Sequence, residues 1–567
     1  MRKQSRAVLG AVLALIAVVV LAACGGSSSS SNSSSNTSSS GSTSTGTSST
    51  PAPSGPATVV EGTFPQSLDP SIDFTTQGGE VHWLTHIGAY SFAHANGTAG
   101  TAIIPAGATA LPTTSNGGKT YSFTVRTGMK YSDGTPVKAC DLKFGVERAL
   151  KLGWSAASFL TSTIVGAAEY STGKAKDVAG ITCDDSSGKV SFNLKSAYGA
   201  FVDVLAIPGV SFLPASTPMK PEPTNPPAGL GPYMIKNVVA NQSFSLVRNP
   251  NYVPIPGISA GKVDINVKVE SNTTTEASDV LNNQADVFDW GDTIPPALVS
   301  QIQGSGRFHA IQTNKTFYWF LNTQEKPFNS VLARQAVQIA VDRVALARLG
   351  SGQLVPGCYL LPPQMVGHPT QPCPPTGFNP AAAPDLAKAK QMVQQSGMAG
   401  QSVTVWAENR QPRLQWCENF ANTLNQIGFK ATLKTIADAD YFSTIEVLKN
   451  HPQAGFADWQ QDFPNPVDFY QNLVDAHAIA PVGNSNYEEA NDPHIQSELA
   501  ALYPVPGSQL NSVASRWQAL DYYVTQKAYL VPFGYLSSPE FVSNRVDQSS
   551  LIFSPLEGPD FSSITLK

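Results

Sequence analysis

Three short motifs carry residue types that could do chemistry. Gly257-Ile-Ser-Ala-Gly261 has the G-x-S-x-G spacing of a hydrolase nucleophile, and Asn116-Gly-Gly-Lys-Thr120 ends like a phosphate-binding loop. His82 and His86 have the i, i+4 spacing that can place two imidazoles on one metal. A nucleophilic serine of this type must follow a strand and open a helix. Here two prolines precede the motif and a strand is expected after it, so we interpret the match as a coincidence.

The other two motifs also lack the context that their chemistry needs. The first glycine of a phosphate loop would fall at Thr113, and the segment joins two strand-like stretches, so we interpret residues 116–120 as a hairpin turn built on Asn-Gly. No carboxylate at a matching spacing accompanies His82, His86 and the nearby His94. We therefore predict no catalytic residue, no metal site and no cofactor. An extracellular hydrolase is kept as the weaker alternative.

The composition limits what kind of protein can hold these residues. The chain has 567 residues, enough for several domains, and 41% of them are hydrophobic, enough for large cores. Lys and Arg number 36 against 41 Asp and Glu, a formal net charge of −5. Without an excess of positive charge, nucleic acid is an unfavourable partner. We expect a globular protein that does not bind nucleic acid.

The first 24 residues predict export and a lipid anchor. Arg2, Lys3 and Arg6 precede an apolar run from residue 7 to 22, the pattern of a signal peptide and too short for the ~20 residues of a spanning helix. Leu21-Ala22-Ala23-Cys24 resembles the bacterial lipobox. The resemblance implies that residues 1–23 are a lipoprotein signal peptide and that Cys24 is diacylated. The alternative is an ordinary secretory cleavage site beside a chance cysteine.

A segment of low complexity follows the predicted anchor. Residues 24–57 consist almost entirely of Ser, Thr, Asn, Gly and Pro, which cannot form a core and behave as a flexible coil. We interpret this segment as a tether that holds a folded domain clear of a membrane surface. A glycosylated stalk remains open as an alternative.

The remaining cysteines agree with an oxidising compartment. Beyond residue 57 they are odd in number, so one thiol stays unpaired: Cys140, Cys183, Cys358, Cys373 and Cys417. A loop rich in Pro and Gly between Cys358 and Cys373 suits a local disulfide, which leaves Cys140 to pair with Cys183. Cys417 lies on an apolar helical stripe and is expected to be a buried thiol. Zinc is the rival interpretation, but no C-x-x-C occurs.

Hydrophobic periodicity predicts strands and helices that alternate along the chain. Alternation of period two predicts strands at residues 121–126, 189–194, 243–247 and 263–269. Helical spacing predicts a helix capped by Asp141 and further helices at residues 331–349, 385–395, 414–427 and 512–527. No fixed repeat is present, so we expect a mixed α/β chain.

One long segment carries a specific resemblance. Residues 120–148, TYSFTVRTGMKYSDGTPVKACDLKFGVER, closely resemble the signature of family 5 extracellular solute-binding proteins, the peptide-binding proteins of ABC importers. Four more stretches are similar to that family in the right order: Ser67-Leu-Asp-Pro70, residues 229–252, residues 317–343 and residues 458–469. The family's usual Tyr-Glu-Gly-Leu is absent, and Ile87-Gly-Ala-Tyr90 stands in its place.

The resemblance implies a fold and a function. The fold would be α/β, two-lobed and periplasmic-binding-protein-like (type II, cluster C), with an extra inserted domain and a hinge. The expected parts are a base lobe, an inserted domain and a second lobe: 58–92 with 207–312 and 531–567, 93–206, and 313–530. The protein would be a monomeric receptor on the outer face of the cell membrane. It would pass a captured peptide to the permease subunits of an ABC importer.

The resemblance also implies which residues meet the ligand. In peptide-binding members, an aspartate three residues after a tryptophan receives the peptide's α-ammonium, and Asp462 after Trp459 matches this pattern. The alternative for Asp462 is a turn cap. Phe463, Tyr318 and Trp319 are expected, with Trp459, as flat apolar walls of a cleft, unless they pack in the core instead.

Two arginines complete the candidate binding site. Arg410 and Arg413 flank a proline just before a predicted helix, and they are candidates to hold a ligand carboxylate, with a solvated surface pair as the alternative. Ligand identity stays open at this point. Oligosaccharides, nickel complexes, haem and wall peptides are rivals to free peptides, because one fold hosts many ligands.

Overall fold

The computed structural model describes residues 55–567. The predicted signal peptide, the candidate lipidation site Cys24 and nearly all of the predicted tether lie outside the described residues. Ala57, which we expected at the end of the tether, is already the first residue of strand β1 (Ala57–Glu61). Between residues 55 and 567, no helix combines the length and the apolar character that crossing a bilayer requires.

The first sheet joins the start of the described chain to strands about 180 residues later, in the order β1-β10-β9-β8. Strand β1 pairs in parallel with β10, and the other neighbours are antiparallel. The remaining strands are β8 (Tyr233–Val239), β9 (Ser243–Arg248) and β10 (Ile265–Val269). The helices of this part of the chain are α1 (Thr76–Thr85), α6 (Thr273–Leu281) and α7 (Val299–Gln303).

A second, antiparallel sheet forms from the segment predicted as an inserted domain, in the order β4-β5-β7-β6. Its strands are β4 (Thr113–Ser115), β5 (Thr120–Thr124), β6 (Ile181–Asp184) and β7 (Lys189–Asn193). Its helices are α2 (Cys140–Leu152), α3 (Ser158–Thr161), α4 (Ala167–Ser171) and α5 (Phe201–Val204). Strand β2 (Tyr90–Phe92) pairs with β3 (Ile103–Pro105) beside it. The turn between β4 and β5 is the hairpin that the Asn-Gly motif predicts.

The third sheet has six strands in the order β12-β16-β11-β15-β13-β14. These are β11 (Phe308–Leu321), β12 (Leu354–Pro356), β13 (Ser402–Glu408), β14 (Lys430–Ile436), β15 (Ala454–Gln460) and β16 (Leu530–Phe541). The helices of this part are α8 (Val331–Ala340), α9 (Arg343–Leu349), α10 (Leu386–Gln395), α11 (Arg413–Gln426), α12 (Tyr441–Ile445), α13 (Val467–Leu473), α14 (Pro493–Leu502) and α15 (Ala514–Lys527). Two short strands, β17 (Phe553–Ser554) and β18 (Gly558–Pro559), pair near the C-terminus.

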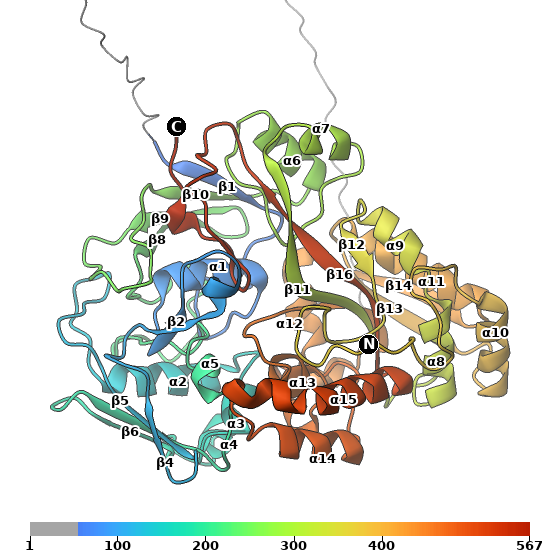
Figure 1. Cartoon of the computed structure of the whole chain (residues 1–567), viewed down its shortest axis with the longest axis horizontal. Coiled ribbons are helices and arrows are strands. Elements are labelled where there is room, and N and C mark those ends of the chain that lie inside the picture. The colour runs from blue at the N-terminus through green and yellow to red at the C-terminus, as the bar shows by residue number, and fades with distance from the viewer. Residues whose placement is uncertain (1–54) are drawn as a thin grey trace, which may run out of the picture. The chain divides into compact units, whose positions relative to one another are not determined.

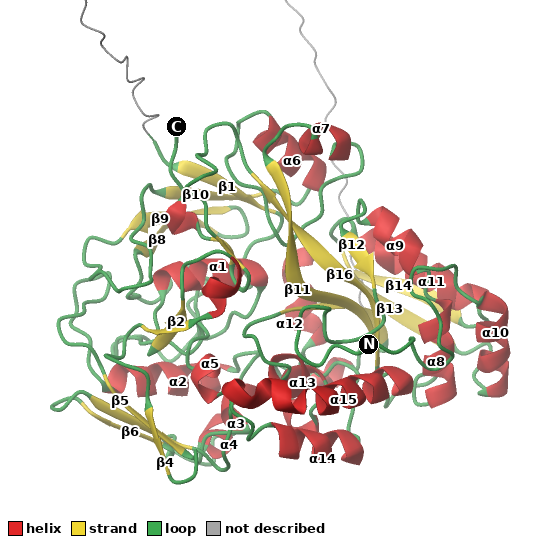
Figure 2. Ribbon diagram, in the orientation of Figure 1, coloured by secondary structure: helices red, strands yellow, loops and turns green. Residues whose placement is uncertain are grey.

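Strands β11 and β16 connect two regions of the structure. Figure 1 shows both running from the side of α6 and α7 into the third sheet, and Figure 2 shows the same two long arrows among the helices. Their pairing is interrupted between Gln312 and Thr316, where the register shifts. This interruption lies at the predicted boundary between the base lobe and the second lobe, residue 312. The division into lobes itself stays a prediction.

Most of the predicted elements are present, with two corrections. Residues 331–349 form two helices, not one, because the chain is extended at Val341 and Asp342 caps α9 by accepting a hydrogen bond from the N–H of Ala345 at 2.9 Å. Asp141 does not cap α2 as predicted. It lies inside the first turn, where its carboxylate accepts hydrogen bonds from the Lys138 N–H and the Tyr131 hydroxyl, both at 2.9 Å.

Among the cysteines of residues 55–567, two disulfides are present, Cys140–Cys183 and Cys358–Cys373, and Cys417 is a buried free thiol. These are the pairs that the sequence predicts. The first ties the start of α2 to β6, and the second joins two cysteines 15 residues apart that form a small buried cluster with Tyr359. On the chain-entropy account, each restrains the unfolded chain and stabilises the fold by about 2–4 kcal/mol.

Candidate ligand-binding cavity

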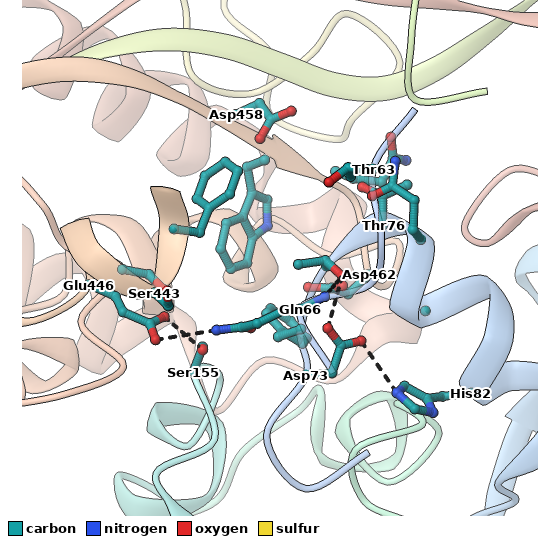
Figure 3. A pocket seen from close by; sticks show the side chains of 18 of the residues that line it. Thr63, Gln66, Asp73, Thr76, His82, Ser155, Ser443, Glu446, Asp458 and Asp462 are labelled. Atoms are coloured by element: carbon teal, nitrogen blue, oxygen red, sulfur yellow. Dashed lines mark hydrogen bonds and ion pairs between the residues drawn. The ribbon is translucent and has the colours of Figure 1, made fainter. Parts of the chain in front are cut away.

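One cavity gathers residues from all three predicted parts of the fold. It offers about 160 Å³ to the centres of water-sized spheres. The loop before α1 and the N-terminal part of α1 form one wall, and the ends of β13 and β15 with the segment around α12 form another. Ser155, between α2 and α3, and Glu557, near the C-terminus, close it further. Figure 3 shows polar side chains from these separate segments converging on the same space.

Arg410 and Arg413 form a charge-paired side of the cavity, which we call the arginine side. The Nη1 of Arg413 lies 2.7 and 3.0 Å from the two carboxylate oxygens of Glu408, the last residue of β13. The Nη2 of Arg410 lies 3.0 Å from Asp289 and 2.7 Å from Asp292. Both arginines are at least 95% buried, so these carboxylates are partners that they need. The alternative of a solvated surface pair is therefore wrong.

Gly62 makes room for the contact of Arg410 with Asp292. A Cβ at this position would lie 2.2 Å from the Nη2 of Arg410 and 2.2 Å from the Oδ2 of Asp292. The Gly62 N–H also donates to Asp289 at 3.0 Å. Gly62, directly after β1, thus holds Asp289 through its N–H. Asp289 in turn pairs with Arg410, which lies in the loop after β13. The pair joins the predicted base lobe to the predicted second lobe.

Asp458 belongs to the same side. It lies on β15, 3.0 Å from the Nζ of Lys315 on β11 and 3.4 Å from the Nη2 of Arg413. Although burial alone would raise it, these two cations bring the pKa of Asp458 below its usual value. The carboxylate is therefore ionised and already neutralised by the protein.

Around Asp462, carboxyl groups lie together without a cationic partner in the described chain, and we call this part of the cavity the carboxyl side. The Asp462 N–H donates to Asp468 at 2.8 Å, and the Trp459 indole N–H donates to the same carboxylate at 3.2 Å. The Oδ2 of Asp462 is buried and has no hydrogen-bond partner among the described residues. Burial and the neighbouring carboxyl of Asp468 raise the pKa of Asp462 well above its usual range. The pKa of Asp468 is raised by burial to about 7.

Glu557 extends the carboxyl side. Burial raises its pKa to about 7, and its negative charge contributes to the raised pKa of Asp462. None of the ion pairs in the described chain involves Asp462, Asp468 or Glu557. Three carboxyl groups therefore converge here without a cation, and a positively charged group entering the cavity would favour their ionised forms.

The structure brings part of the predicted site together and leaves part in the core. Asp462, Trp459, Arg410 and Arg413 line the cavity. Tyr318, Trp319 and Phe463 are fully buried and do not line it. Trp319 stacks on Phe420 of α11 at 4.3 Å and on Phe533 of β16 at 4.7 Å, and Phe463 packs on Phe159 at 5.4 Å. Their strand and loop are covered by other elements, so these rings serve packing.

Several polar residues of the cavity were not singled out from the sequence. They are Gln66, Asp73, Glu446, Asp458 and Glu557, which line the cavity, and Asp468, which lies buried beside Asp462. Asp458 and Asp468 lie inside a stretch that resembles the family, and Gln66 directly precedes another, so proximity to those motifs was an available signal. Glu446 and Glu557 lie outside every motif, and no periodic pattern marks them.

The three histidines do not form a metal site. His82 lies 3.4 Å from Asp73, and His94 lies 2.8 Å from Asp560. His86 contacts the Pro227 carbonyl oxygen at 3.1 Å, and burial lowers its pKa to about 3. Within residues 55–567, no group of three or more His, Cys, Asp or Glu side chains is arranged to hold a metal ion.

Comparison with known proteins identifies the family. Residues 102–480 match the profile described as bacterial extracellular solute-binding proteins, family 5 Middle. The chain belongs to this family. Family 5 consists of binding proteins, which confirms the resemblance and the expectation of a binding protein rather than an enzyme.

Relatives of this family 5 protein extend the comparison. It is 28% identical to the oligopeptide-binding protein OppA of Bacillus subtilis over 269 residues. This match covers 45% of this chain and 48% of OppA. The match therefore spans about half the length of that relative.

Solved structures of other binding proteins share the fold. The periplasmic binding protein DppA of Helicobacter pylori, in complex with the peptide STSA, superimposes with a TM-score of 0.75 at 19% identity, over 90% of this family 5 chain and 98% of DppA. The binding protein AgaA from A. tumefaciens R10, in complex with agropinic acid, superimposes with a TM-score of 0.73 at 18% identity, over 90% and 98%. The predicted α/β fold of the cluster C type is thereby confirmed.

Proposed function

We propose that this protein is the lipid-anchored substrate-binding component of an ABC importer, which captures di- or oligopeptides in the cavity and delivers them to the permease. Family membership supports a role in solute binding. The observation that carries the peptide assignment is Asp462, whose Oδ2 lies buried on the cavity wall without a partner among residues 55–567.

The chemistry of the carboxyl side suits an α-ammonium group. A cation removed from water needs an anionic partner, and Asp462 offers one oxygen that no described group uses. Gln460, on the same wall, has neither its amide oxygen nor its amide nitrogen hydrogen-bonded within the described chain. Such an amide can accept from and donate to a peptide group at once. Together the two side chains match the amino end of a peptide.

The relatives support a peptide as the ligand and leave one alternative ligand class open. One is named an oligopeptide-binding protein, and one structure of the same fold holds a peptide. The structure with agropinic acid shows that the fold also accommodates a solute that is not a peptide. A non-peptide solute with a positively charged group is therefore the second candidate.

A four-way binding experiment tests the assignment. Calorimetry would compare trialanine and N-acetyl-trialanine on the wild type and on Asp462→Asn. We expect each single change to reduce affinity at least tenfold, because a desolvated cation loses its partner at a cost of about 2–5 kcal/mol. We expect the two losses not to add, since both remove one interaction. Equal binding of both tripeptides by the wild type would contradict the α-ammonium role and favour the non-peptide candidate.

The anchor is tested separately. We propose that Cys24 carries lipid and holds the protein, as a monomer, on the outer face of the cell membrane. Two acyl chains bury many CH₂ groups at about 0.8 kcal/mol each, so wild type should partition into the membrane fraction and Cys24→Ser should not. A distribution unchanged by the substitution would disprove the anchor without touching the binding function.

A further inference from the structure

The charges that line the cavity do not balance. Two guanidinium groups, those of Arg410 and Arg413, face seven carboxyl groups: Asp73, Glu408, Asp438, Glu446, Asp458, Asp462 and Glu557. Four of the seven have a positively charged or protonatable neighbour within the protein. Arg413 pairs with Glu408 and Asp458, and His82 lies beside Asp73. Arg410, against the effect of burial, lowers the pKa of Asp438.

Glu446 is one of the three that have no such neighbour. It lies at the end of α12, is 8% exposed and lines the cavity. Its carboxylate accepts hydrogen bonds only from neutral groups, the Ser155 hydroxyl at 2.9 Å and the Gln66 amide at 3.5 Å. No described Lys, Arg or His forms an ion pair with it. Figure 3 shows Glu446 held by these two side chains, with Asp462 and Asp73 on the other side of Gln66 in the view.

The position of Glu446 makes its charge available to a ligand. Burial raises its pKa to about 7, so the group sits between its neutral and ionised forms near neutral pH. A cation brought against it would favour the ionised form and expel a proton. Gln66 and Ser155 fix the carboxyl in place, because each comes from a different segment of the chain.

A second observation in the lining of the cavity points to a ligand. Trp290 is 2% exposed and lines the cavity, and its indole N–H donates to no described group. A buried donor of this kind needs an acceptor, such as a peptide carbonyl oxygen. Arg410 and Arg413, in contrast, are already engaged by carboxylates. Of the buried nitrogen atoms of these two arginines, only the Nε of Arg410 remains without a partner among the described residues, so the lining offers acceptors for positive charge and few free donors for a ligand carboxylate.

We propose that the cavity selects peptides with a second positive charge, a lysine- or arginine-like side chain that Glu446 receives while Asp462 receives the α-ammonium. This inference rests on the proposed function and narrows its substrate class to basic peptides. Glu446 is then a specificity-determining residue.

Matched tripeptides test the inference. The probes are trialanine, Ala-Lys-Ala and Ala-Ala-Lys, together with the two lysine peptides acetylated on the side chain, which keep their length but lose the charge. In calorimetry on the wild type, one lysyl peptide should bind at least tenfold more tightly than its acetylated form. In buffers of different ionisation enthalpy at pH 7, that peptide should also release more protons than the acetylated one.

Two variants separate the role of Glu446 from general effects. Glu446→Gln keeps an oxygen for Ser155 and should remove the preference for the lysyl peptide and its extra proton release, while trialanine affinity changes less than threefold. Glu418→Gln makes the same chemical change on the exposed face of α11 and should leave the preference intact. Thermal unfolding checks that both variants are folded.

Each outcome has a defined meaning. Equal wild-type affinity for lysyl and acetyl-lysyl peptides overturns the inference but leaves peptide binding standing. A preference that survives in Glu446→Gln overturns the assignment to this residue. If no tripeptide binds, the proposed peptide function fails together with the inference.

Discussion

The two sides of the cavity solve the problem of buried charge in opposite ways. On the arginine side, Arg413 is held by Glu408 and Asp458, and Lys315 adds a further positive charge beside Asp458. On the carboxyl side, Asp462 lies beside Asp468 without an ion pair in the described chain. A buried charge that is paired within the protein stabilises one geometry. A buried carboxyl group without a cation either binds a positively charged ligand or takes up a proton. The difference separates residues that hold the cavity in shape from residues free to bind.

Breaking the arginine side should have the largest effect on stability. Arg413→Met leaves Glu408 and the ionised Asp458 buried without the guanidinium that both contact, which should lower the free energy of unfolding by about 3–5 kcal/mol. Urea unfolding measures the loss. The control is Arg516→Met, which breaks the half-exposed pair with Glu498 at 2.9 Å and should cost no more than about 1 kcal/mol. Equal losses in the two variants would show that the arginine side is not a structural element.

Crowding the Arg410 contact should have an intermediate effect. Gly62→Ala places a methyl group 2.2 Å from the guanidinium and the Asp292 carboxylate, and the overpacking should cost about 1–3 kcal/mol. The same substitution in an Arg410→Ala background should cost less, because one of the two clashes is removed and the Asp292 carboxylate, no longer held by Arg410, can shift. Gly507→Ala, at a glycine with no atom within 4 Å of its Cβ position, is the control. Additive losses in the double variant would contradict the proposed contact.

The carboxyl side should give the smallest effect and one of opposite sign. Burial raises the pKa of Glu557 to about 7, above the ~4.3 of an unfolded glutamate. Its contribution to stability is therefore present below about pH 4 and is lost as the pH rises through 7. Glu557→Gln removes this loss, so at pH 8 it should raise the free energy of unfolding relative to wild type by about 1 kcal/mol, a value reduced for solvent screening.

The sign of that effect is checked at a second pH. At pH 4 the wild-type carboxyl is protonated in the folded state and largely protonated in the unfolded state, so Glu557→Gln and wild type should unfold at nearly the same urea concentration. Glu418→Gln, on the exposed face of α11, should differ from wild type by the same small amount at both pH values. A Glu557→Gln variant that is less stable than wild type at pH 8 would refute the unpaired state of this carboxyl.

The sequence predicted local structure better than it predicted the site. Strands such as β5 and β7 follow directly from alternating side chains, since one face packs and the other is exposed. The break between α8 and α9 was missed because Asp342 fits a helical period as well as a cap. Tyr318 and Trp319 were expected in a cleft, but a central strand has both faces covered, which the spacing of aromatic residues cannot reveal.

The site depends on contacts between distant parts of the chain. Arg410 meets Asp289 across 121 residues, and Gln66 meets Glu446 across 380. Asp462 was predicted because a short motif surrounds it. Glu446 and Glu557 could not be predicted, because only the folded arrangement of α12, the loop before α1 and the C-terminal segment brings them to the cavity.

The absence of a Cβ at Gly62 has a consequence for the evolution of this protein. As long as an arginine occupies position 410 and an aspartate position 292, a side chain at position 62 meets both, so the three positions constrain one another although hundreds of residues separate them. Homologues that replace both the arginine and the aspartate should be free to carry a larger residue at position 62, and those that keep them should keep glycine. Substitutions at these three sites should then be inherited as a set, and a lone change at one of them should be rare.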